Sequence, residues 1–179
     1  MTELAAEALC HLLATRGLDH YDEEVTQLDH ALQTAALAAN DGAADELVVA
    51  ALFHDIGHLL APPAEGDDEH EKTGASVLAA AFGPAVAGPV ALHVQAKRYL
   101  VAAEPGWAAR LSEASRLSLA LQGGPFTPAG AARFAALPAA ADAIALRRWD
   151  DDAKVVGAPR PPIGYWQPTI DRVLAARAG

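Results

Sequence analysis

Cysteine is nearly absent from this chain of 179 residues, which contains only Cys10. A single cysteine excludes a disulfide framework and a thiolate cluster for zinc or iron–sulfur, so any metal ion must have nitrogen and oxygen ligands. The sequence also lacks a charged segment followed by an apolar run at its start, and it has no apolar run of the roughly 20 residues that cross a bilayer. We therefore expect a cytoplasmic protein with no membrane partner.

Basic residues are scarce as well, with 13 lysines and arginines against 23 aspartates and glutamates and a formal net charge of −10. This balance disfavours nonspecific attraction to nucleic acid or to anionic lipid. A small anion still binds where basic groups or metal ions are concentrated in one cleft. The composition carries no signal for an oligomeric state.

Strand patterns are missing too, because apolar residues recur at helical spacing and no segment alternates with a period of two. Thr26 is an N-cap candidate for a helix ending at Asn40, and the prolines of "APPAEG" end a helix that starts at Asp45. We expect an all-α, single-domain helical bundle over residues 1–179. The predicted helices are 3–15, 26–40, 45–60, 70–82, 85–102, 107–121, 127–137, 139–150 and 167–177, with "GAPRPPIG" as an ordered surface strap before the last one.

The stretch "AALFHDIGHLL" at 50–60 places His54, Asp55 and His58 in an otherwise apolar helix. Burying such groups without partners costs roughly 2 to 7 kcal/mol for a neutral polar group and more for a charge. A hydrogen-bonded core cluster or a metal ion must compensate. An antiparallel turn near "NDGAAD" brings His30 of the preceding helix close to the His54–Asp55 pair.

Taken singly, each of these histidines is more typical of a hydrogen-bonded core residue. The set indicates otherwise, because each further histidine or aspartate lies on its own predicted helix or at a helix start. Imidazole and carboxylate are ligands for first-row metal ions, and the set exceeds what one tetrahedral site needs. Two ions sharing a carboxylate would use every member: His30, His54, Asp55, His70, His93 and Asp150.

This order of residues resembles the HD-domain superfamily, whose motif is a histidine, a later His-Asp pair and a distal aspartate around a metal ion in a helical bundle. Other stretches resemble the PhnZ type of HD-domain oxygenase over about residues 18 to 154. These stretches are "YDEEVTQLDHALQ", "HEKTGA", "HVQAKRYLV", "LSEASR", "LQGGPF" and "RRWDDDAK".

The resemblance implies two iron ions in a mixed-valent Fe(II)/Fe(III) centre, with O2 as co-substrate. One iron would be held by His30, His54, Asp55 and Asp150, and the other by His70, His93 and a bridging Asp55. The implied reaction cleaves the carbon–phosphorus bond of a 1-hydroxy-2-amino- or 1-hydroxy-2-trimethylammonio-ethylphosphonate. Phosphate and an amino acid, glycine or betaine, would be released.

A phosphonate needs donors beyond the metal. Lys97 lies one helical turn after His93 and His58 one turn after His54, so both are expected to face the cavity. By the family pattern Arg147 is the candidate for a two-pronged contact, and Ser115 for a hydroxyl donor. Arg98 and Arg148 are expected on solvated helix faces with salt bridges.

For the cationic end of the substrate, the family uses a tyrosine and a glutamate before the first histidine. Glu23 matches the glutamate, and Tyr21 matches the tyrosine that caps an iron, with His20 as the alternative for that position. The loop "APPAEGDDE" lacks the aromatic residues expected of a pocket lid. "QGGP" at 122–125 is predicted to be a tight turn with positive φ at glycine.

Two other classes of function stay open at this point. An HD phosphohydrolase would use the same ligands to direct a hydroxide at a nucleotide or a phosphomonoester. A metal-stabilised binding module would need no chemistry at all. Glu23, Tyr21 and Lys97 favour the oxygenase, because a hydrolase has no need for a cationic-tail pocket beside its metal ions.

Overall fold

The computed structural model describes residues 2–20, 24–60 and 69–178. These residues form α-helices, one 3-10 helix and connecting turns, with no strand among them, so the predicted all-α fold is confirmed. The helices are α1 (Thr2–Arg16), α2 (Gln27–Asn40), α3 (Asp45–Phe53), α4 (Ile56–Leu60), α5 (His70–Phe82), α6 (Pro84–Ala103), α7 (Trp107–Arg110), α8 (Glu113–Leu121), α9 (Pro128–Ala135), α10 (Ala140–Asp152), η1 (Ile163–Trp166) and α11 (Gln167–Ala178).

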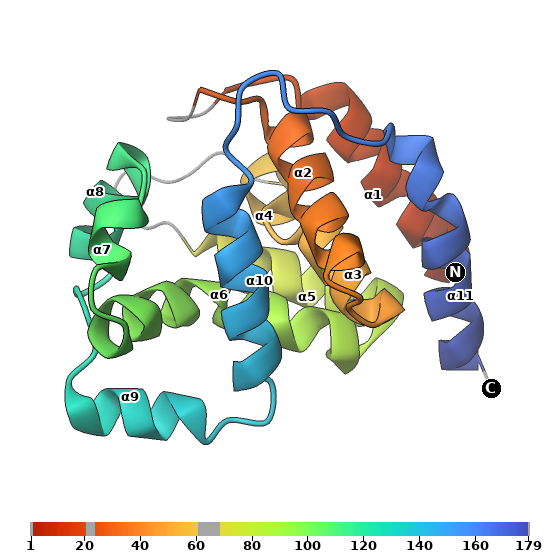
Figure 1. Cartoon of the computed structure of the whole chain (residues 1–179). Helices are drawn as coiled ribbons and strands as arrows, with labels where there is room; N and C mark the ends of the chain where they lie inside the picture. Colours follow the sequence, from red (N-terminus) through yellow and green to blue (C-terminus); the bar gives the residue numbers. More distant parts are fainter. Residues whose placement is uncertain (1, 21–23, 61–68, 179) are drawn as a thin grey trace.

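Helices α2, α3, α5, α6 and α10 form the centre of the bundle (Figure 1). Helix α3 is its most apolar element, with every residue from Val48 to Phe53 buried, as expected for a helix enclosed on all sides. Helices α1 and α11 pack along one side of this centre, and α7, α8 and α9 lie on the other (Figure 1). Trp107 and Leu111 join Leu100 of α6 in a small core that anchors α7 and α8.

Two predicted helices are each broken into two, which corrects the sequence analysis. The predicted helix 45–60 stops at Phe53, and α4 begins only at Ile56, so His54 and Asp55 lie in the turn between α3 and α4. The predicted helix 107–121 is interrupted at Leu111 and Ser112. In both places the apolar pattern continues across the break and so hides it. The start of α8 is indicated in the sequence only by its N-cap residue, Ser112, whose side chain accepts a hydrogen bond from the backbone N–H of Ser115.

The predicted cap of α2 is confirmed, since the Thr26 side chain accepts a hydrogen bond from the backbone N–H of Asp29 at 3.0 Å. The strap after α10 is also ordered, as predicted. Gln33 of α2 exchanges two hydrogen bonds with the backbone of Val155, and Arg160 pairs with Asp29. The segment that follows α10 is therefore fastened onto α2, beside the site described below.

The turn after α8 has positive φ at Gly123 (90°) and Gly124 (68°), as predicted for "QGGP". Arg98 is half-buried and forms no salt bridge with the described residues, contrary to expectation. Its Nε donates to the carbonyl of Gly124 at 2.7 Å, and its guanidinium lies 4.4 Å from the centre of the Phe126 ring. Arg148 does form the expected exposed ion pair, with Glu104.

Close approach of α4 and α5 requires glycine at position 57. A Cβ atom placed there would lie 2.0 Å from the carbonyl oxygen of His70, which is backbone and has little room to move. We expect Gly57→Ala to lower the free energy of unfolding by about 1 to 3 kcal/mol, as overpacked sites do, measured by urea denaturation. Gly164→Ala is the matched control, because no atom lies within 4 Å of that Cβ position. Equal losses of stability in the two variants would show that the close approach of α4 and α5 does not require glycine at position 57.

No single helix in the described parts of the chain is long and apolar enough to cross a membrane. Helices α9 and α10 together meet the length and composition test, but they are bent by 108° relative to each other.

Candidate dinuclear metal centre

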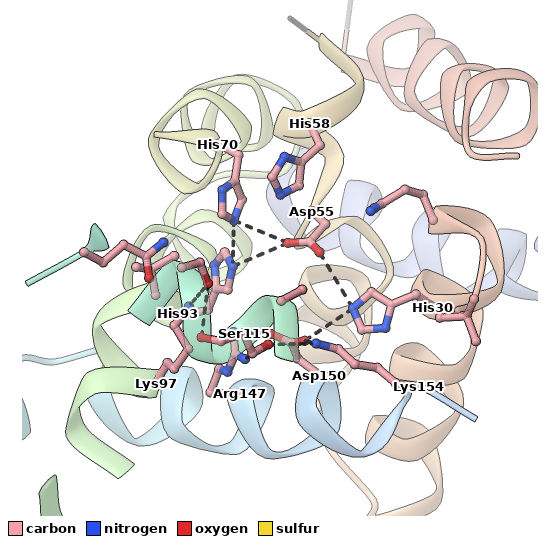
Figure 2. A pocket seen from close by; sticks show the side chains of 16 residues that line it. His30, Asp55, His58, His70, His93, Lys97, Ser115, Arg147, Asp150 and Lys154 are labelled. Atoms are coloured by element: carbon pink, nitrogen blue, oxygen red, sulfur yellow. Dashed lines mark hydrogen bonds and ion pairs between the residues drawn. The ribbon is translucent and has the colours of Figure 1, made fainter. Parts of the chain in front are cut away.

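The fold brings six predicted metal ligands from five parts of the chain to one place. All of them except His54 are labelled in Figure 2. They are His30 from α2, His54 and Asp55 from the turn between α3 and α4, His70 at the start of α5, His93 from α6, and Asp150 from α10. His30, His54, His93 and Asp150 are buried.

The first cluster contains His30, His54 and Asp150. The Nε2 atoms of the two histidines are 3.1 Å apart, and His30 Nε2 is 3.3 Å from Asp150 Oδ1. Asp55 Oδ2 faces this cluster, at 3.4 Å from His54 Nε2 and 3.7 Å from His30 Nε2.

The second cluster contains His70 and His93, whose Nε2 atoms are 3.2 Å apart. Asp55 Oδ1 is 3.5 Å from each of these nitrogens. The two oxygens of one carboxylate therefore face two different histidine clusters. This is the arrangement that a carboxylate bridging two ions requires.

The donor atoms fit a pair of metal ions. Ligands bonded at about 2.1 Å around one ion lie about 3.0 to 3.4 Å from each other, and most separations within the two clusters are near this range. All donors are nitrogen or oxygen, which suits iron, manganese, zinc and similar ions.

Hydrogen bonds at the other ring nitrogen orient three of the imidazoles. The Nδ1 atoms of His30, His54 and His93 lie 3.0, 2.9 and 2.7 Å from the backbone carbonyls of Ala153, Ala51 and Val90. A carbonyl only accepts, so each Nδ1 carries the proton and each Nε2 presents its lone pair to the cluster.

His70 differs from the other three. Its Nδ1 faces a carboxylate oxygen of Glu71 at 3.9 Å, and that oxygen is buried with no hydrogen-bond partner among the described residues. The second cluster therefore has a buried carboxyl oxygen behind one of its ligands, whereas the described outer partners of the first cluster's imidazoles are backbone carbonyls.

The electrostatics of the site favour a bound cation. Burial lowers the pKa of His54 to about 4, so this imidazole is neutral and able to bind metal. Burial by itself raises the pKa of Asp55, but the surrounding imidazoles, His54 above all, outweigh it and hold that pKa well below its usual range. For His30 burial lowers the pKa, yet the hydrogen bond to Asp150 and the carboxylate charges raise it overall, so the cluster attracts positive charge.

A cavity of about 140 Å³ lies beside both clusters. Lys97 and His58, which the sequence predicted to face it, both line its wall, and the His58 ring stacks on His70 at 3.9 Å between ring centres. Lys97 Nζ donates to Ser118 Oγ at 2.7 Å, and burial, followed by the charge of Arg147, lowers the pKa of Lys97 to about 8. The cavity therefore combines metal-binding groups with cationic ones.

Arg147 lines the same cavity, but its two terminal nitrogens are engaged by carboxylates. Nη1 lies 2.7 Å from Asp150 Oδ2, and Nη2 pairs with Asp151 and donates to Ser115 Oγ at 3.3 Å. The guanidinium predicted to make a two-pronged contact with a ligand thus contacts two aspartates in this structure. Only Nε, which is buried without a partner among the described residues, has no such contact.

Sequence reasoning missed Lys154, Ser118 and Gln122, which also line the cavity. Lys154 follows Asp150 by one turn, the same spacing that identified Lys97 after His93, so the signal was present.

Three predicted features lie outside the described residues: Tyr21, Glu23 and most of the loop "APPAEGDDE". His20, the alternative to Tyr21, is exposed.

Comparisons with known proteins agree with this geometry. The HD domain model matches residues 28–119. The chain is 43% identical to a hydroxymethylphosphonate dioxygenase of Gimesia maris over 174 residues, which is 93% of this chain and 87% of that protein. It is 37% identical to a glycine-betaine-forming [1-hydroxy-2-(trimethylamino)ethyl]phosphonate dioxygenase of Leisingera caerulea, over 92% of this chain and 87% of that protein. An uncharacterized mimivirus protein, L432 of Acanthamoeba polyphaga mimivirus, is 32% identical over 84% of this chain and 73% of its own length.

The chain therefore belongs to the HD-domain family. Within that family its relatives place it with the PhnZ-type oxygenases, so it is an enzyme of the oxygenase class, as the sequence predicts.

Proposed function

We propose that this enzyme is a di-iron, O2-dependent oxygenase that cleaves the carbon–phosphorus bond of a small 1-hydroxyphosphonate. The observation that carries the proposal is Asp55, whose two oxygens face the two histidine clusters at the edge of a cationic cavity. The names of the two characterised relatives support the substrate class. We further propose that residues 1–179 act as one HD-type domain and that the reaction takes place in the cytoplasm.

In this proposal His30, His54, Asp55 and Asp150 hold one iron, and Asp55, His70 and His93 hold the other, in the mixed-valent Fe(II)/Fe(III) state. Iron, when bound, supplies Lewis acidity and the electrons that activate O2. The chain's own residues hold the substrate beside it. The phosphonate dianion is bound by the positive charge of Lys97 and Arg147 and by hydrogen-bond donors such as Ser115 and His58.

The atoms balance when one O2 is consumed for each substrate. The carbon–phosphorus bond, one C1–H bond and the O–O bond break, one oxygen atom of O2 goes to carbon and the other to phosphorus, and the hydrogen from C1 ends on oxygen. Phosphorus therefore leaves as phosphate and C1 leaves as a carboxylic acid. Hydroxymethylphosphonate would yield formate, whereas the 2-amino and 2-trimethylammonio compounds would yield glycine and betaine. Glu23 and Tyr21 are proposed to contact the cationic end of the two larger substrates.

Oxygen dependence tests the proposal against the phosphohydrolase alternative. The protein is reconstituted with iron without air, each of the three hydroxyphosphonates is added, and phosphate is measured with and without O2. We expect phosphate only with O2, in a one-to-one ratio to the O2 consumed, and an EPR signal from a coupled Fe(II)Fe(III) pair. Release that is indifferent to O2, or is supported equally by magnesium or manganese, would establish hydrolysis instead.

The pH dependence of kcat/KM is expected to report Lys97. With a pKa of about 8, this side chain is cationic below that pH and neutral above it, so affinity for a phosphonate dianion is lost as the pH rises through this value. kcat/KM should fall about tenfold per pH unit above the pKa. Lys97→Arg keeps the charge at all these pH values and should abolish the fall. The same alkaline limb in both enzymes would exclude Lys97 as its source.

A further inference from the structure

The hydroxyl group of Ser115 has an unusual set of neighbours. Ser115 lies in the first turn of α8, is buried, and lines the cavity beside the metal clusters (Figure 2). Its Oγ accepts a hydrogen bond from Arg147 Nη2 at 3.3 Å and another from Lys154 Nζ at 3.0 Å. Both donors come from a different part of the chain, α10 and the residues that follow it.

These two contacts determine what the hydroxyl can do. A serine Oγ has one hydrogen to donate and two lone pairs with which to accept. Arginine and lysine side chains only donate, so both lone pairs of Ser115 are in use. The remaining capacity is donation, and the Ser115 hydrogen has no acceptor in the described part of the chain. It is available to an acceptor in the cavity.

Ser118, the neighbouring serine of the same wall, is in the opposite situation. Its Oγ accepts from Lys97 Nζ at 2.7 Å and donates to the backbone carbonyl of Ser115 at 3.2 Å. Its hydrogen is therefore used within α8. Of the two serines, Ser115 is the one with a hydrogen left for a ligand.

We propose that Lys154 is a positioning residue of this enzyme, which occupies an acceptor position of Ser115 Oγ and so fixes its hydroxyl as a donor to an oxyanion of the bound substrate. Lys154 is itself held near the metal site, with Nζ 3.8 Å from Asp150 Oδ1. One lysine thereby links a proposed metal ligand to a donor of the anion pocket. This inference rests on the proposed function, because it takes the ligand to be a phosphonate.

Binding of methylphosphonate, an unreactive phosphonate, to the iron-loaded protein tests this role by calorimetry. Ser115→Ala and Lys154→Met are each expected to raise its Kd about tenfold or more, the usual effect of losing a hydrogen bond to a charged group. The double variant should lie within about threefold of the weaker single variant, because Ser115→Ala already removes what Lys154 orients. Lys154→Arg, which keeps a cationic donor, should restore most of the affinity.

The chain offers a matched control, since Lys72 is an exposed lysine paired with Glu69 and lies outside the cavity lining. Lys72→Met should bind methylphosphonate like the wild type. With a hydroxyphosphonate substrate, Lys154→Met should raise KM while kcat changes only a few-fold, because the lost contact serves substrate and transition state alike.

Three results would overturn the inference. Wild-type affinity in Lys154→Met would show that Lys154 has no part in binding. A double variant about a hundredfold weaker than wild type, the product of the two single effects, would mean that Lys154 acts on the anion directly. Loss of iron from Lys154→Met would assign its role to Asp150 instead. A wild-type, iron-loaded protein that does not bind methylphosphonate at all would contradict the proposed function itself, which is a separate outcome.

Discussion

Asp55→Asn is expected to remove the dinuclear centre and to lower the oxygenase activity by about a thousandfold or more. Asparagine keeps the shape of the side chain but has no charge. It has only one oxygen, and its amide nitrogen cannot bind the second metal ion. Both histidine clusters depend on Asp55, since Oδ2 faces one and Oδ1 the other. A metal centre supplies several kcal/mol of transition-state stabilisation, and each ~1.4 kcal/mol is a factor of ten in rate.

Elemental analysis of iron per chain and turnover of hydroxymethylphosphonate measure this effect. We expect fewer than two irons per chain and loss of the EPR signal of the coupled pair. Asp152→Asn is the matched control on the same helix as Asp150, because Asp152 is half exposed and pairs only with Arg110 among the described residues. Asp152→Asn should retain wild-type iron content. A variant Asp55→Asn with two irons and normal turnover would exclude a bridging role for this carboxylate.

Arg147→Met is expected to have the largest effect on stability. Arg147 is buried, with 4% of its surface exposed, and its guanidinium is the cation that faces both Asp150 and Asp151. Removing it takes the nearest arginine away from two buried carboxylates and leaves Lys154, 3.8 Å from Asp150, as a more distant cation. Breaking a buried ion pair typically costs 3 to 5 kcal/mol, so we expect a loss of about this size in the free energy of unfolding. Burial by itself raises the pKa of Asp150, but the charge of Arg147 outweighs it and holds that pKa well below its usual range. The loss should therefore be full near pH 7 and should shrink as the pH falls below the ordinary pKa of an aspartate, because a protonated carboxyl needs no cation.

The neighbouring Arg148→Met provides the comparison, measured by urea denaturation of the metal-free protein. Arg148 pairs with Glu104 at the surface, where both side chains are more than a third exposed, and such pairs contribute about 1 kcal/mol or less. Two adjacent arginines should thus differ severalfold in effect. Similar losses for the two variants would show that the buried ion pairs of Arg147 contribute no more than an exposed one.

Much of the fold follows from local signals that the sequence displays. The helix at 70–82 has the predicted bounds, and the cap at Thr26 and the glycine turn at 123–124 form as expected. The breaks at His54–Asp55 and at Leu111–Ser112 were not predicted, since the apolar residues on either side stay in helical register. A helix interruption that serves tertiary packing leaves little trace in periodicity alone.

The six metal-binding candidates could be predicted because their types and order survive in the sequence, and the structure brings all of them together. The contacts of Arg147 and Arg98 could not, since a guanidinium on a helix can reach several partners and only the packed neighbours decide among them. Arg147 turns to Asp150 and Asp151, and Arg98 turns to the carbonyl of Gly124. Lys154 was not predicted because it lies four residues after an aspartate, Asp150, whereas Lys97 and His58 each lie four residues after a histidine.

The backbone carbonyls behind His30, His54 and His93 have a consequence for how this enzyme can be altered. No point mutation deletes a main-chain oxygen, so these three imidazole rings keep their orientation when nearby side chains are substituted. Side chains of the pocket wall can thus be exchanged to accept other phosphonates, whereas the orientation of the metal-binding imidazoles is set by the backbone. Libraries that vary residues 114, 118 and 122 of α8 and its following turn should yield variants that still load metal.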